Sequence, residues 1–168
     1  MKAISLLQPW CSLVAIGAKQ IETRSWSTKH RGEIAIAASA RFTKAQDATT
    51  ASEPFLSAII AGHGNRDLPL GCIVAVATLV DVDQMRETGE GHAGHGLGWH
   101  FLSGPLGDRM VAAPGEEAFG HYEPGRYGWL LADVRRLPEP VPCKDALGLW
   151  TVPPEVEAKV RHQLGGSK

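Results

Sequence analysis

The sequence has little net charge and no long apolar run, and each shortage disfavours a class of protein. Its formal net charge is −1, from 17 Lys and Arg against 18 Asp and Glu. Tight sequence-independent binding to long duplexes depends on neutralising many phosphates, so it is disfavoured, whereas a local basic cleft or a pocket for one nucleotide is not. No apolar run reaches the roughly 18 residues of a membrane span. We therefore expect no membrane partner.

Cysteines and catalytic signatures are also scarce. Cys11, Cys72 and Cys143 are odd in number, far apart and without a CxxC pair, which argues against a disulfide framework or a zinc knuckle. The first five residues lack the apolar core and cleavage site of a signal peptide, so we expect a cytoplasmic location. We find no Ser-His-Asp triad with supporting context, P-loop or dinucleotide fingerprint. We expect no cofactor.

The length of 168 residues suits one domain, residues 1–168, with a real hydrophobic core. Residues 83–126 differ in composition from the rest of the chain, because glycine and histidine are frequent there. We interpret them as an insertion. We expect residues 87–117 to be the most mobile part of the chain. No internal repeat is visible.

Local patterns predict strands that alternate with helices. Trp10, Leu13 and Val14 recur at helical spacing after Pro9, and Gly17 can end that helix. Thr43 with Gln46 has the form of a capping box. The expected strands cover residues 2–7, 19–26, 32–39, 70–82 and 127–137, and a last helix covers 153–164. They predict an α+β fold, a mixed β-barrel with flanking helices, with Ile73, Val80 and Leu130 inside.

The stretch from residue 8 to residue 26 concentrates polar and aromatic side chains. It holds a lysine, a glutamate, an arginine, glutamine and two tryptophans among apolar residues. A pocket that stacks a flat ring and hydrogen-bonds its edge needs this combination. On a strand, Glu22 and Arg24 would share one face and Lys19 the other, whereas a turn would let Lys19 and Glu22 converge. The sequence leaves both arrangements open.

The same stretch carries a family resemblance. The run "ISLLQPWCSLVAIGAKQIETRSW", followed by "RGEIAIAAS", resembles the opening of an ASCH domain of the PUA-like superfamily. The later run "YGWLLADVRRLPEPVPCKDALGLW" resembles the family's closing strand and loop. Together they bracket almost the whole chain and agree with the predicted mixed barrel. The positions that fit the opening pattern are Gln8, Pro9, Trp10, Gly17, Lys19, Glu22, Arg24, Trp26, Arg31 and Gly32.

The resemblance implies binding to RNA or to a modified nucleotide or nucleoside. Some small ASCH proteins are amidohydrolases that deacylate N4-acetylcytidine, and ribonuclease activity is also attributed to the family. The amidohydrolase pattern has a lysine followed three positions later by threonine, with a glutamate on a later strand. Here Glu22 follows Lys19 at that distance, Thr23 is displaced by one, and residues 70–82 contain no glutamate. The sequence departs from the pattern at both places.

Each candidate side chain has a binding role and a plainer structural alternative. Lys19 would clamp a carbonyl or phosphate or act as a base, rather than being a solvated lysine. Glu22 and Arg24 would bind an exocyclic amine and a carbonyl or phosphate, or form only a structural ion pair. Tryptophans can stack bases, but we favour a core position for Trp10 and a cleft wall for Trp26. Beyond this stretch, Trp129 is expected in the core, and the Tyr127 hydroxyl would reach the cleft.

Three histidines, His92, His95 and His100, invite a metal assignment. Zinc sites normally show firmer scaffolding and a fourth ligand or a catalytic water. In a glycine-rich stretch a polar lid is the better interpretation, so we expect no metal.

The leading interpretation is a domain that binds RNA or a nucleotide in a cleft around Lys19, Glu22 and Arg24. The expected ligand-binding residues are Gln8, Trp10, Lys19, Glu22, Arg24, Trp26, Arg31 and Tyr127. The second interpretation is a hydrolase of a modified nucleoside or of RNA, with Lys19 and Glu22 as catalytic residues. The third is a protein-interaction module that binds no nucleoside, with partners that the sequence does not identify.

Overall fold

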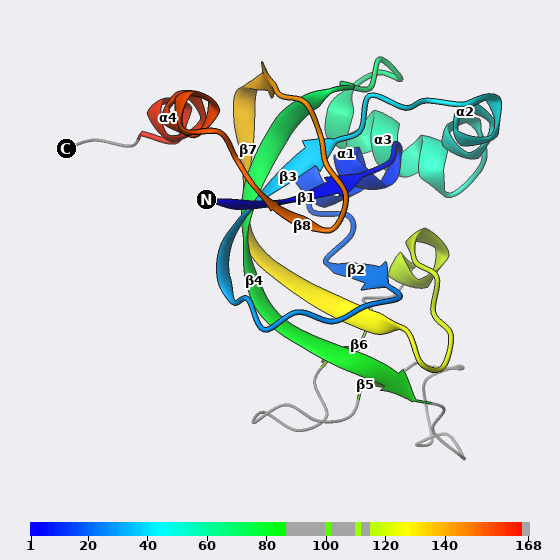
Figure 1. Ribbon diagram of the computed structural model, residues 1–168. Helices are drawn as coiled ribbons and strands as arrows, with labels where there is room; N and C mark the ends of the chain where they lie inside the picture. The colour runs from blue at the N-terminus through cyan, green and yellow to red at the C-terminus, as the bar shows by residue number, and fades with distance from the viewer. Residues whose placement is uncertain (87–99, 102–109, 112–114, 166–168) are drawn as a thin grey trace. The chain divides into compact units, whose positions relative to one another are not determined.

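The computed structural model describes residues 1–86, 100–101, 110–111 and 115–165. These residues form eight strands, four α-helices and one 3-10 helix. Figure 1 labels them along the chain. Their bounds are β1 Lys2–Leu6, α1 Trp10–Ala15, β2 Ile21–Arg24, β3 Gly32–Ala38, α2 Lys44–Ala51, α3 Phe55–His63, β4 Cys72–Arg86, β5 His100–Phe101, β6 Met110–Val111, η1 Glu116–Phe119, β7 Tyr127–Pro142, β8 Leu149–Thr151 and α4 Pro154–Gln163.

The chain divides into two compact units that share the long strands β4 and β7. Unit 1 consists of residues 1–19, 33–78 and 133–168, and unit 2 of residues 20–32 and 79–132. Unit 1 has the strand order β7-β4-β3-β1-β8, and unit 2 has β2-β7-β4 with β5 and β6 beyond β4. The β1–β3 pair is parallel and the β1–β8 pair antiparallel, so the sheet is mixed. This confirms the predicted α+β class, a mixed sheet with flanking helices.

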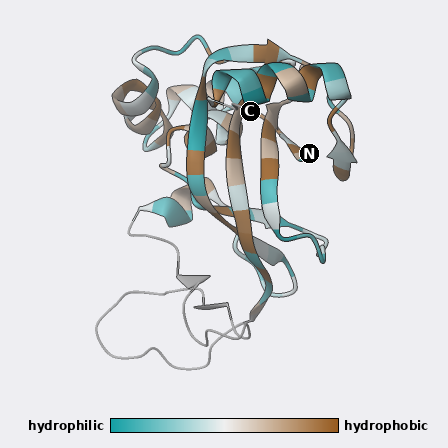
Figure 2. Ribbon diagram, turned by 90° about the vertical axis from the view of Figure 1, so that its left-hand side faces the viewer, coloured by the Kyte–Doolittle hydropathy of each residue, from teal (hydrophilic) through white to brown (hydrophobic). Residues whose placement is uncertain are grey.

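The core of unit 1 lies on strands β1, β3 and β4. Ala3, Ala35, Ile73 and Val76 have almost no exposed surface and pack with residues of β7 and α4. All residues from Cys72 to Ala77 are buried, which explains their continuous apolar run. Figure 2 shows this as long hydrophobic stretches on the strands.

In unit 2, the half of β4 after Thr78 alternates between more buried and more exposed side chains. Leu79 and Met85 are buried, whereas Val80 is 41% exposed. The prediction that Val80 lies inside is therefore wrong, because it continued an apolar run past the point where only one face of β4 is covered. Ile73 is buried as predicted, and Leu130 is partly buried beside Ile21, Met85 and Tyr122.

The helix signals are confirmed with small shifts in bounds. Thr43 caps α2, its side chain accepts from the Gln46 amide, and the reciprocal bond of the capping box is present. Gly17 follows α1 with φ +78°, a conformation that glycine adopts without steric cost. The strand expected at 19–26 is the shorter β2, and the one expected at 70–82 runs on to Arg86. Most of the proposed insertion lies outside the described residues, and the single-domain organisation stays a prediction.

A charge network ties β3, β7 and α4 together in unit 1. Glu33 binds the guanidinium of Arg135 at 2.6 Å and that of Arg161 at 3.1 Å, and Arg161 also binds Glu157. The hydrogen bond from Arg135 holds the pKa of Glu33 below its ordinary value, against an opposing effect of burial, and Arg161 adds to the lowering. Glu33 is thus ionised in the folded chain at a pH where the unfolded chain already binds a proton.

We expect Glu33→Gln to reduce the pH dependence of stability. A carboxyl whose pKa is lowered by folding stabilises the fold above its unfolded pKa, and this contribution is lost as the pH falls through the folded pKa. The difference in urea midpoint between the parent and Glu33→Gln should thus be largest near neutral pH and vanish in acid. Glu155→Gln, at an exposed position on α4, is the control and should keep the parental profile. A constant difference at every pH would contradict the assignment.

Candidate functional site

Strand β2 in unit 2 carries two of the candidate side chains. It pairs antiparallel with β7, so that Glu22 lies opposite Trp129 and Arg24 opposite the half-buried Tyr127. Residues two apart on a strand share a face, and Arg24 Nε lies 3.1 Å from Glu22 Oε1. The Glu22 side chain is 11% exposed and that of Arg24 is 24% exposed. This half-buried ion pair places a carboxylate and a partly accessible guanidinium side by side.

Glu116 on the 3-10 helix η1 fixes the start of β2. One oxygen of its carboxylate, Oε1, accepts from the Gln20 amide at 2.7 Å and from the Ile21 amide at 2.6 Å. Its residue is only 3% exposed. Backbone amides bound to a charged acceptor form the stronger class of hydrogen bond. Glu116 therefore holds the start of β2, the strand that carries Glu22 and Arg24. Nothing in the sequence marks this residue except its place after a glycine-rich stretch.

Tyr122 is a second residue that the sequence analysis did not identify. It is 8% exposed and packs with Ile21, Met85 and Leu130. Burial raises the pKa of its phenol, and the carboxylates of Glu116 and Glu22 raise that pKa further. Unit 2 thus places two buried carboxylates near one protonated phenol.

Two tryptophans pack edge to face next to β2. The rings of Trp26 and Trp129 have centroids 4.7 Å apart at 83°, and Trp129 Nε1 donates to the Trp26 carbonyl at 3.3 Å. Trp129 is fully buried, which confirms its predicted core position, whereas Trp26 is partly exposed. The exposed part of Trp26 is compatible with the proposed cleft wall, which stays a prediction.

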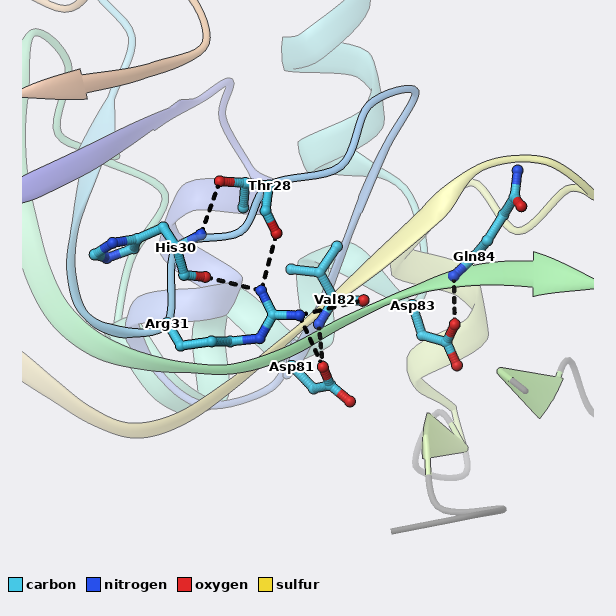
Figure 3. A network of polar contacts seen from close by, with 7 residues as sticks. All are labelled: Thr28, His30, Arg31, Asp81, Val82, Asp83 and Gln84. Carbon is cyan, nitrogen blue, oxygen red and sulfur yellow. Dashed lines mark hydrogen bonds and ion pairs between the residues drawn. The ribbon is translucent and has the colours of Figure 1, made fainter. Parts of the chain in front are cut away.

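Arg31 is engaged by the protein itself (Figure 3). Its Nη1 donates to the carbonyls of Thr28 and His30, both at 2.9 Å, and its Nη2 binds Asp81 Oδ1 at 2.9 Å. These contacts brace the loop before β3 against β4. The guanidinium therefore has a structural function in this loop, and a ligand-binding function of Arg31 stays a prediction.

The remaining candidates belong to unit 1. Lys19 follows the turn after α1, is 1% exposed, and donates its backbone amide to the Leu13 carbonyl. Gln8 is fully buried, and its side-chain amide bonds to the Pro69 carbonyl and the Ser12 amide. Both polar atoms of the Gln8 side chain are thus used inside the fold. Trp10 is only half-buried, with its ring edge-on to Phe55 at 5.9 Å, so the core position favoured from the sequence is not confirmed.

No metal site is found among the described residues. Within the described ranges, no group of three or more His, Cys, Asp or Glu side chains is placed to hold an ion. His92 and His95 lie outside the described residues, and His100 begins β5, where only the backbone is described. Within the same ranges, no helix is long and apolar enough to cross a bilayer.

Comparison with known proteins identifies the family. The ASCH domain model matches residues 4–140. The chain is 35% identical over 81 residues to activating signal cointegrator 1 of Homo sapiens and 33% identical over 81 residues to that of Mus musculus. Each alignment covers 46% of this chain and only 14% of the relative, so the likeness concerns a small part of those proteins. The chain belongs to the ASCH domain family, a PUA-like fold associated with RNA binding.

Proposed function

We propose that this ASCH domain binds RNA or a modified nucleotide, with Glu22 and Arg24 in unit 2 as contact residues. A ligand-binding function of Lys19, in unit 1, is proposed separately. The observation that carries the proposal is the burial of charge within one short motif, where Lys19 is 1% and Glu22 8% exposed. Lysine and glutamate are almost never so buried unless paired. A buried ion pair contributes little to stability, so stability alone does not explain why this motif buries charged residues.

The chemistry of the β2 side chains fits a nucleotide. The Glu22 carboxylate only accepts hydrogen bonds, as an exocyclic amine requires, and the Arg24 guanidinium donates to carbonyl or phosphate oxygens. The partly exposed Trp26 ring next to them offers a surface for base stacking. Cys11, Cys72 and Cys143 are buried and, among the described residues, form no disulfide, which fits the reducing cytoplasm that we propose as the location.

Lys19→Met and Glu22→Gln test the proposal, because each removes a charge and keeps most of the side-chain volume. Loss of a hydrogen bond to a charged group should weaken binding by about 2–3 kcal/mol. The measurement is binding to a panel of modified nucleosides and short RNAs, with mass spectrometry of retained and released species. Lys29→Met changes an exposed lysine in the same region and should bind as the parent does. If both variants bind every ligand as well as the parent, these residues are not the site.

A second candidate function, hydrolysis of a modified nucleoside or of RNA, is favoured by the surroundings of Tyr122. A buried phenol with a raised pKa close to Glu22 and Glu116 is the kind of perturbed group that active sites contain. A hydrolase that uses Glu22 in proton transfer should lose kcat in Glu22→Gln far more than affinity. A binding domain would release the nucleoside unchanged, and an interaction module would retain none.

A further inference from the structure

Unit 1 contains a small, partly open pocket that the proposed function does not use. It lies between α1, α3 and the part of β7 near Arg136, with a volume of about 150 Å³. Pockets for drug-sized ligands hold roughly 300–1,000 Å³, so this one accommodates a single ring system. Ile16, Val74 and Leu137 contribute apolar lining, and Ser12, His63, Asp67 and Arg136 contribute polar lining.

The rim of the pocket is organised by a contact between His63 and Arg136. Arg136 Nη2 lies 2.6 Å from His63 Nδ1, and His63 Nε2 lies 3.3 Å from the Asp67 carbonyl. A guanidinium only donates, so Nδ1 accepts and Nε2 carries the proton that the carbonyl receives. Arg136 also donates to the Gly62 carbonyl at 3.3 Å. The imidazole is saturated, whereas the guanidinium keeps N–H groups for a ligand.

Two further polar groups line the same pocket. Asp67 is exposed, and among the described residues its carboxylate takes part in no ion pair. Ser12 is only 3% exposed and lines the pocket, and its hydroxyl is not among the buried side-chain atoms that lack a partner. A hydroxyl that lines a pocket can donate to or accept from a ligand bound there. The pocket thus combines a donor on Arg136, a carboxylate acceptor on Asp67 and the Ser12 hydroxyl with apolar walls.

We propose that this pocket binds one nucleobase that carries both a carbonyl oxygen and an exocyclic amine, that is, guanine or cytosine. Arg136 would donate to the carbonyl oxygen, and the Asp67 carboxylate would accept from the amine. The apolar side chains would cover the faces of the ring, as in pockets that read an extruded base. Adenine lacks the carbonyl and uracil lacks the amine, so each satisfies only one of the two charged groups. This inference does not depend on the proposed function of β2.

The test is a titration of the full chain with guanosine, cytidine, adenosine and uridine, observed by NMR signals of Ile16 and Val74. Guanosine and cytidine should bind about tenfold or more tightly than the other two, the discrimination of one good base contact. Asp67→Asn should abolish most of that preference. Asp145→Asn, a carboxylate outside the pocket, is the matched control and should leave it unchanged. Ser12→Val adds an independent arm, because it should weaken binding of both preferred nucleosides.

The source of the base is decided by comparing free nucleosides with short single-stranded RNAs of cytidine or uridine. Binding of cytidine in both forms supports a pocket for free bases, and binding of the RNA alone supports a pocket for an extruded base. Equal binding of all four nucleosides, or a preference that survives Asp67→Asn, would overturn the inference. Ligand-dependent signals at Glu22 and Arg24 with none at Ile16 and Val74 would overturn it too, while supporting the proposed function. Ligand-dependent signals at Ile16 and Val74 with none at Glu22 and Arg24 would support this inference and contradict the proposed function.

Discussion

Trp129→Ala should lower the free energy of unfolding by about 3–5 kcal/mol, the range for truncation of a large buried aromatic residue. Trp129 is fully buried, contacts the Trp26 ring edge to face, and uses its indole N–H on the Trp26 carbonyl. Alanine would leave a cavity and also an unsatisfied carbonyl. Denaturant unfolding of the parent and the variant, analysed by linear extrapolation, measures the difference.

Trp129→Phe separates the two causes of that loss. Phenylalanine keeps an apolar ring at the position but cannot donate to the Trp26 carbonyl. We expect a smaller cost for this variant, since much of the buried apolar area remains. A loss below about 1 kcal/mol in Trp129→Ala would mean that the site collapses around the smaller side chain, contrary to our interpretation.

Glu116→Ala should cost about 2–4 kcal/mol, the second largest effect we expect. The substitution removes one carboxylate oxygen that accepts two backbone amides at 2.7 and 2.6 Å. The Ile21 amide is buried, so without Glu116 it loses a hydrogen bond that water does not easily replace. The same unfolding measurement applies, and amide exchange at Gln20 and Ile21 should accelerate along with it.

The neighbouring residue provides the matched control. Glu117 is exposed, and within the described part of the chain its side chain accepts from the Gly115 amide alone, at 3.0 Å. Glu117→Ala should therefore change stability by no more than about 0.5 kcal/mol. Similar losses of stability in Glu116→Ala and Glu117→Ala would show that the charge of η1 stabilises the fold, rather than the hydrogen bonds between Glu116 and the start of β2. Glu116→Gln keeps an acceptor oxygen and should fall between the parent and alanine.

Much of the fold was predictable because its signals are local. A few neighbouring residues are enough to predict the Thr43 cap, the glycine after α1 and the apolar run of β4. The burial of Val80 was predicted wrongly because it depends on what covers each face of β4, a tertiary property. Alternation gives a strand two faces but does not say which of them is covered.

The candidate site was harder to predict from the sequence, because it too depends on tertiary contacts. The ion pair between Glu22 and Arg24 follows from their spacing on a strand, and the structure confirms that they share a face. Glu116 reaches β2 across 95 or more positions of the chain, and no local pattern encodes such a distance. Arg31 fits the family motif, yet the structure commits its guanidinium to neighbouring carbonyls and to Asp81.

The hydrogen bonds from the Gln20 and Ile21 amides to Glu116 have a consequence for self-association. Among the strands that the structure describes, β2 ends the strand order and pairs with β7 alone, so its other side resembles the open edges on which chains add to one another. It is only four residues long, carries charged side chains, and has its first amide taken by a carboxylate. Short, charged and blocked edges resist strand addition from a second chain. The residue that shapes the candidate site thus also protects the protein against aggregation at this edge.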